Sequence, residues 1–165
     1  MNKKTLILAV SAVIMLALAG LVLSTQLLVK TPNKDFKTDP EFYNSLGNYF
    51  VQHEEIGKAI NAYETGLTFG ENAETRNNLA VIYYRQGEYD EAIANLRILI
   101  KDYPDNPSYH YDLAVNLVDK FRSSSEQSIA DLEEALAEYQ LAEELQPGYA
   151  NAQGNIEVLK QVLEQ

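Results

Sequence analysis

The feature of this sequence that most constrains its fold is the stretch 78–104, whose pattern indicates two short helices joined by a tight turn. Leu79 and Tyr83 lie four residues apart, on one stripe of a first helix. Gly87 is expected to end that helix, because glycine adopts the left-handed backbone of a helix C-cap without steric cost. Asp90 is expected to cap the second helix through its side-chain oxygen. The stretch therefore predicts a helical hairpin.

The spacing of small and apolar residues predicts that this hairpin recurs. Small residues at Ala80 and Ala92 allow its two helices to approach closely. Leu79 and Ala92 are 13 residues apart, and the same step separates Leu46 from Ala59. Equal spacing fixes which helix faces meet across the turn, so the two segments are expected to fold alike. The second helix of the central hairpin carries Ala92, Leu96, Leu99 and Ile100 at helical spacing and is followed by Pro104.

These patterns resemble the tetratricopeptide repeat (TPR), a unit of 34 residues with small and aromatic residues at fixed positions of two helices. The resemblance covers about residues 40–165 and implies an all-α fold. That fold is an α-solenoid of about three helix pairs, shielded at its end by a capping helix that begins after Pro147. The predicted segments are 40–72, 73–106 and 107–149 for the three repeats and 150–165 for the capping helix.

The third repeat departs from the family pattern. Leu113 and Ala135 are 22 residues apart, which places an insertion of nine residues between its two helices. Ser123 with Glu126, or Ser124 with Gln127, could form a capping box at the start of the second helix. We therefore expect two lengthened helices, a turn near 123–125, and a second helix over about 126–146.

The first 39 residues show a different pattern. Residues 1–4 are basic, and the apolar stretch 5–29 is long enough for a transmembrane helix. It is expected to be an anchor that leaves the N-terminus cytoplasmic and the repeats outside the cytoplasm. The alternative is a signal peptide cleaved near Ala19, which would yield a secreted or periplasmic protein. Residues 30–39 are expected to form a linker.

Composition limits the possible functions. The chain has no cysteine and only two histidines, so we expect no metal site and no cofactor. Its formal charge is −11, and a surface this acidic repels phosphate backbones, which makes nucleic acid an unexpected partner. Paired carboxylates such as Glu133 and Glu134 are interpreted as solvated helix surface. We find no catalytic constellation, so no enzymatic activity and no small-molecule substrate are expected.

The resemblance implies that partners bind in a concave groove lined by the first helix of each repeat. Helix geometry then selects the face about 100° away from the one that packs on the second helix. This groove is expected to begin polar and end apolar, although its valines could instead pack against neighbouring helices. Its predicted residues are Asn44, Asn48, Val51, Asn77, Val81, Tyr84, Tyr111, Val115 and Val118.

One subclass of the family fits poorly. TPR proteins that grip the C-terminal carboxylate of chaperones have asparagines where this chain has Asn48 and Asn78. They also need basic residues on the first and third of these helices, and the candidate positions here carry Asn44, Ser108 and Asp112. A carboxylate at Asp112 would repel the carboxylate of such a ligand.

The sequence therefore predicts a non-enzymatic TPR adaptor, tethered to a membrane, that binds a peptide or helix of a partner protein in its groove. The alternative is a self-associating structural subunit or assembly factor of an envelope complex such as a secretion, pilus or respiratory assembly. An acidic C-terminal part, in which 126–165 contains nine acidic residues and only Lys160 as a basic one, could attract a basic partner.

Overall fold

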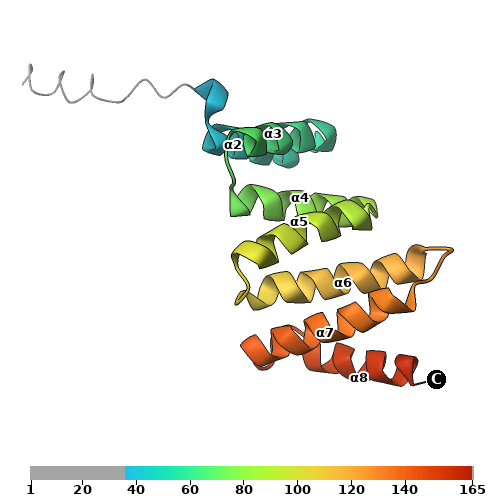
Figure 1. The fold of residues 1–165 in the computed structure, drawn as a ribbon. Helices are drawn as coiled ribbons and strands as arrows, with labels where there is room; N and C mark the ends of the chain where they lie inside the picture. Colours follow the sequence, from blue (N-terminus) through green and yellow to red (C-terminus); the bar gives the residue numbers. More distant parts are fainter. Residues whose placement is uncertain (1–35, 165) are drawn as a thin grey trace, which may run out of the picture. The chain divides into compact units, whose positions relative to one another are not determined.

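The computed structural model describes residues 36–164, and these residues are helical throughout apart from short connections. Residues 38–165 form one compact unit, in which each helix packs against the next one along the chain (Figure 1). A 3-10 turn at Phe36–Thr38 precedes the helices. The helices are α2 (Pro40–Gln52), α3 (Ile56–Phe69), α4 (Ala73–Gln86), α5 (Tyr89–Asp102), α6 (Pro107–Ser123), α7 (Ile129–Leu145) and α8 (Ala152–Leu163).

Short polar caps begin several helices. The side chain of Asp39 accepts a hydrogen bond from the backbone N–H of Glu41, and Pro40 occupies the first helical position of α2. Asn72 and Asn106 cap α4 and α6 in the same way. These side chains satisfy backbone N–H groups that have no partner within their own helix.

The turn between α4 and α5 confirms one prediction and corrects another. Gly87 lies in the left-handed region, with φ 78°, and ends α4 as expected. The prediction that Asp90 caps α5 was wrong, because α5 already begins at Tyr89 and Glu88 holds the cap position. The backbone N–H of Glu88 donates to the carbonyl of Tyr83 at 2.9 Å, and this bond turns the chain directly into α5.

The insertion in the third repeat lengthens α6 and α7 to 17 residues each, whereas the helices of the first two repeats have 13 or 14. The expectation that the second helix starts near Glu126 was wrong by about one turn, since α7 starts at Ile129. The Oγ of Ser124 accepts a hydrogen bond from the backbone N–H of Glu126 at 3.0 Å. This bond closes a local turn, so the predicted capping box does not begin the helix.

Small residues bring paired helices close together, as the sequence predicted. Ala59, Ala92 and Ala135, which hold corresponding positions in the second helix of each repeat, are completely buried. In the first repeat, Gly47 of α2 leaves the space that the ring of Tyr63 of α3 fills. Each hairpin therefore depends on the absence of a larger side chain at these positions.

The buried side chains form two clusters that meet within α4. The smaller cluster consists of Ala59, Tyr63, Leu79 and Ile82 and lies between α3 and α4. The larger cluster extends from Ala80 of α4 through α5, α6 and α7 to α8. Leu79 and Ala80 are adjacent in sequence but belong to different clusters. Helix α4 therefore joins the first repeat to the remainder of the stack.

The predicted single-pass membrane localisation requires correction. None of the helices over residues 36–164 has the length and apolar character that a membrane crossing demands. The longest, α6 and α7, have 17 residues and carry charged side chains, whereas a span needs about 20 mostly apolar residues. The predicted anchor at 5–29 and most of the predicted linker lie outside the described residues.

Candidate functional site

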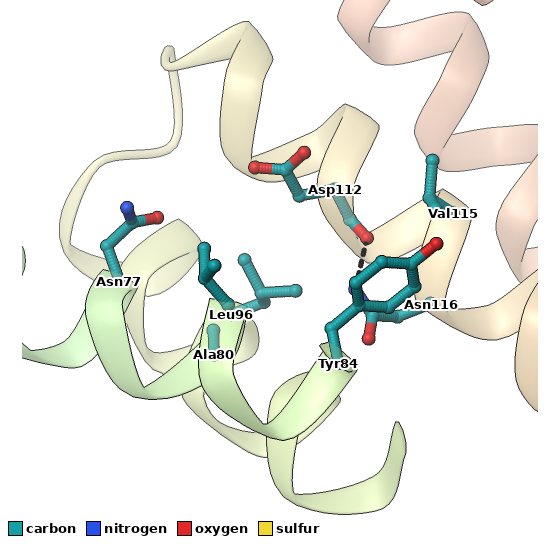
Figure 2. Close-up of a pocket in the computed structure, with 8 residues that line it drawn as sticks. Asn77, Ala80, Tyr84, Leu96, Asp112, Val115 and Asn116 are labelled. Carbon is teal, nitrogen blue, oxygen red and sulfur yellow. Dashed lines mark hydrogen bonds between the residues drawn. The ribbon is translucent and has the colours of Figure 1, made fainter. Parts of the chain in front are cut away.

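The candidate site is a pocket between α4 and α6 with a volume of about 90 Å³ (Figure 2). Helix α4 contributes residues spaced three and four apart, which places them on one face. Helix α6 contributes a second set with the same spacing, and α5 contributes one residue. The lining residues are Asn77, Ala80, Val81, Tyr84, Leu96, Asp112, Val115 and Asn116.

Four residues of the predicted groove meet at this pocket, namely Asn77, Val81, Tyr84 and Val115. Val81 is 38 % exposed, so an apolar side chain at the pocket remains open to solvent. Leu96 of α5 is almost fully buried and supplies apolar surface to the lining. A partner side chain that covered Val81 and Val115 would therefore remove apolar surface from water.

Tyr84 bridges the two helices beside the pocket. Its hydroxyl donates a hydrogen bond to Oδ2 of Asp119 on α6 at 2.9 Å. Its ring also meets the ring of Tyr89 edge to face, with the centroids 5.9 Å apart. The hydrogen bond to Asp119, together with burial, raises the pKa of Tyr84 to about 12, so the hydroxyl remains a donor at neutral pH. Tyr84 thus fixes the spacing of α4 and α6 as well as lining the pocket.

Two polar residues of α6 complete the lining and were not among the predicted site residues. Asp112 receives a hydrogen bond from Oγ of Ser108 at 3.4 Å, and burial raises the pKa of its carboxyl group. Asn116 is only 4 % exposed. Its Nδ2 donates to the backbone carbonyl of Asp112 at 2.8 Å, while its Oδ1 has no hydrogen-bond partner among the described residues.

These two residues could have been found from the helical repeat. Asp112 and Asn116 are four residues apart, and both flank Val115 on the same side of α6. The predicted groove followed the apolar stripe through Val115 and Val118 and did not include the polar stripe beside it. The negative charge of Asp112 was noted only as a feature that opposes carboxylate ligands.

The predicted groove residues of the first repeat are engaged in packing. Oδ1 of Asn48 accepts hydrogen bonds from the hydroxyl of Tyr63 at 2.5 Å and from Nδ2 of Asn78 at 3.1 Å. This arrangement links α2, α3 and α4. Asn44 is buried, and Val51 packs against the smaller of the two buried clusters. We therefore leave these three residues out of the candidate site.

The remaining two predicted residues, Tyr111 and Val118, also pack within the stack. The ring of Tyr111 meets that of Tyr139 on α7 at 5.3 Å and that of Tyr149 at 5.7 Å, measured between centroids. Val118 packs against the larger buried cluster. Removing Tyr111 would therefore disturb the contact of α6 with α7 rather than a free surface.

Among the described residues, the buried histidine contributes to packing between elements. In the part of the chain that the structure describes, no three His, Asp or Glu residues are grouped so that they could hold a metal ion. His110 is buried and donates from Nε2 to the backbone carbonyl of Pro104 at 2.7 Å. Its Nδ1 lies 2.6 Å from Oε2 of Glu138. Nδ1 thus joins α6 to α7, and Nε2 joins α6 to the connection that precedes it.

Comparison with known families identifies the fold. The tetratricopeptide repeat family model matches residues 44–107 and 77–150, which together cover more than half of the chain. The chain therefore belongs to the tetratricopeptide repeat family, a class of helical proteins that serve as scaffolds for protein interaction. No curated protein matches the sequence.

Solved structures share the fold at low sequence identity. One is the first TPR domain of Spaghetti (RPAP3) bound to the HSP90 peptide SRMEEVD, with 18 % identity, a TM-score of 0.62, and coverage of 78 % of this chain and 96 % of that one. The Sgt2 TPR domain from Aspergillus fumigatus has 22 % identity and a TM-score of 0.59, with coverage of 76 % and 79 %. YrrB, described as a TPR protein with an unusual peptide-binding site, has 21 % identity and a TM-score of 0.63, with coverage of 77 % and 61 %.

Proposed function

We propose that this chain is a non-enzymatic adaptor that binds a segment of a partner protein in the pocket between α4 and α6. The observation that carries the proposal is the composition of that pocket. Apolar side chains from three helices lie beside polar side chains that can direct a bound segment. Binding sites for peptides and small ligands commonly combine these two features.

The two kinds of side chain would serve different parts of a partner segment. Val81, Val115 and Leu96 offer apolar surface to one side chain of the partner. The amide of Asn77 carries both a donor and an acceptor, which suits the backbone of an extended peptide. The pocket is small, so it would hold one side chain, and the rest of the segment would extend along α4 and α6.

The fold neighbours support binding of a peptide rather than of a folded substrate. One neighbour was solved with a peptide of HSP90, and another, YrrB, is described as having an unusual peptide-binding site. Family membership favours the same class of partner.

The proposal is tested with a matched pair of substitutions. Val81 at the pocket and Ile98 on α5 are each 38 % exposed, and Ile98 does not line the pocket. Val81→Trp should fill the pocket, whereas Ile98→Trp adds the same bulk elsewhere. Both variants of the full chain are incubated with a library of random heptapeptides immobilised on beads, and the amount of captured protein is measured.

We expect Val81→Trp to lose most of the capture and Ile98→Trp to retain it, with both variants keeping the helical circular dichroism spectrum. Equal capture by the two variants would show that the pocket is not the binding site. Capture that is absent even with the unchanged chain would contradict peptide binding altogether.

Self-association is a second candidate, and a specific observation favours it. Val158 and Val162 of α8 are 59 % and 45 % exposed, so no other helix of residues 36–164 covers these side chains. A second copy of the chain could cover these side chains. Sedimentation velocity across a hundredfold range of concentration would reveal such a dimer, and Val158→Asp should then return the chain to a monomer.

A further inference from the structure

The polar side of the pocket consists largely of hydrogen-bond acceptors. Asp112 supplies a carboxylate, and Asn116 supplies an amide oxygen that has no donor among the described residues. Both side chains come from adjacent turns of α6. The Nδ2 of Asn116 donates to the backbone carbonyl of Asp112, and its buried Oδ1 adds an unpaired acceptor to this side of the pocket.

No basic side chain of the described residues pairs with Asp112. The basic residues of α5 and α6 that form ion pairs are directed to other carboxylates. Lys120 pairs with Asp90 at 2.8 Å, and Arg97 pairs with Glu134 at 2.7 Å. The Oγ of Ser108 is a weak, distant donor at 3.4 Å. The pocket therefore carries a negative charge that no basic side chain of residues 36–164 neutralises.

This arrangement is unfavourable unless a donor arrives from outside. A buried acceptor without a donor, such as Oδ1 of Asn116, is unfavourable. Burial of a carboxylate such as Asp112 beside apolar side chains is costly for the same reason. A cationic group with several N–H donors would compensate the charge of the Asp112 carboxylate.

We propose that the pocket selects partner segments carrying an arginine or lysine, whose cationic group pairs with the Asp112 carboxylate. This inference rests on the proposed function and specifies the chemistry of its ligand. The aliphatic stem of either side chain would lie against Val81 and Val115, because long basic side chains bury their methylene groups on apolar surface.

The charge of the whole chain acts in the same direction. Three of its 13 basic residues lie within 1–30, so 10 basic residues accompany all 24 acidic ones in the remainder. Such a surface attracts basic segments from a distance and repels acidic ones.

The test uses heptapeptide libraries that differ only at the central residue. This residue is arginine in the first library, citrulline in the second and glutamate in the third, and the other six positions are random. Citrulline has the shape of arginine without its charge. Each library is used to capture four proteins, and the bound protein is measured. The four are the unchanged full chain and its variants Asp112→Asn, Val81→Trp and Ile98→Trp. Asp112→Asn removes the charge with little change of shape.

The arginine library should capture the unchanged chain about tenfold more than the citrulline library, which corresponds to about 1.4 kcal/mol, and the glutamate library should capture least. In Asp112→Asn the preference for arginine over citrulline should fall to within about twofold, whereas in Ile98→Trp it should persist. Circular dichroism verifies that each variant is folded.

The other outcomes separate this inference from the proposed function. The arginine and citrulline libraries could capture the unchanged chain equally, with this capture lost in Val81→Trp. That outcome would support peptide binding in the pocket but overturn recognition of a basic residue. A preference for arginine that survives in Asp112→Asn would also overturn the inference and would place the basic partner on another acidic surface, such as residues 126–165. Failure of all three libraries would contradict both proposals.

Discussion

A single methyl group added at Gly47 should destabilise the first repeat. A Cβ at this position of α2 would lie 2.7 Å from Cζ of Tyr63 and closer still to Cε1 and Cδ1 of the same ring. Real Cβ atoms essentially never approach other atoms to within 3.0 Å, so the ring must move. Tyr63 is buried and donates to Asn48 at 2.5 Å, and a displaced ring would strain both its packing and this hydrogen bond.

The expected magnitude for Gly47→Ala follows from three contributions. Overpacking of a well-filled core costs about 1–3 kcal/mol. Loss of the hydrogen bond between Tyr63 and Asn48 adds about 1 kcal/mol. Alanine favours a helix over glycine by about 1 kcal/mol, which offsets part of the cost. The net destabilisation should therefore be about 1–3 kcal/mol, or a fall in Tm of about 4 °C per kcal/mol for a domain of this size.

Gly57 provides the matched control for this substitution. It lies in α3, and a Cβ added there would meet no atom within 4 Å. Gly57→Ala should therefore raise the stability by up to about 1 kcal/mol through helix propensity alone. Thermal and urea denaturation of the full chain, followed by circular dichroism, measures both variants.

A second variant tests the role of the ring directly. In Gly47→Ala combined with Tyr63→Leu, the total destabilisation should be smaller than the sum of the two single changes, because the smaller side chain leaves room for the methyl group. If Gly47→Ala alone melts at or above the temperature of the unchanged chain, the close approach of α2 and α3 described here is incorrect.

Three further predictions concern the rest of the stack. Ala92→Leu should cost about 1–3 kcal/mol, because Ala92 is completely buried between α4 and α5; an unchanged urea midpoint would contradict this. His110→Leu should cost about 2–4 kcal/mol of stability, because it leaves Glu138 partly buried without its hydrogen-bond partner. Adding Glu138→Gln to this variant should recover part of the lost stability, as measured by thermal melts. Tyr84→Phe should cost about 1 kcal/mol at pH 7. Because the folded pKa of Tyr84 is raised from 10.0 to about 12, its contribution is present below pH 10 and is lost as the pH rises to about 12. The difference in free energy of unfolding between the unchanged chain and Tyr84→Phe should therefore shrink over that interval. A constant difference would show that the hydrogen bond to Asp119 does not raise the pKa of Tyr84 in the folded chain.

The repeat fold could be predicted because its main determinants are local in sequence. Gly87 ends a helix through its own backbone conformation, and Ala92 permits close packing through its own size. The 13-residue step repeats these determinants in the same register, so faces that meet in one hairpin meet in the next. The start of α7 was less predictable, since Ser124 satisfies a backbone N–H within a turn instead of within a helix.

The candidate site was only partly predictable because the use of a polar side chain depends on distant neighbours. Asn48 and Asn77 lie on the same predicted face of the first helices of successive repeats, yet Asn48 is bonded to Tyr63 and Asn78. Those partners lie 15 and 30 residues away in sequence. Asn116 shows the converse case, since its buried oxygen lacks a donor, and only the packed structure reveals this.

The division of the buried side chains within α4 has a consequence for how the molecule opens. Because the larger cluster extends from Ala80 to α8 without α2 and α3, those two helices can separate while the rest of the stack keeps its core. In a linear array each unit is stabilised by its neighbours alone, and the terminal unit has only one. Amide hydrogens of α2 and α3 should therefore exchange with solvent through a partial opening of lower free energy than the one that exposes α5 and α6. The candidate pocket between α4 and α6 would then lie in the part of the stack that opens last.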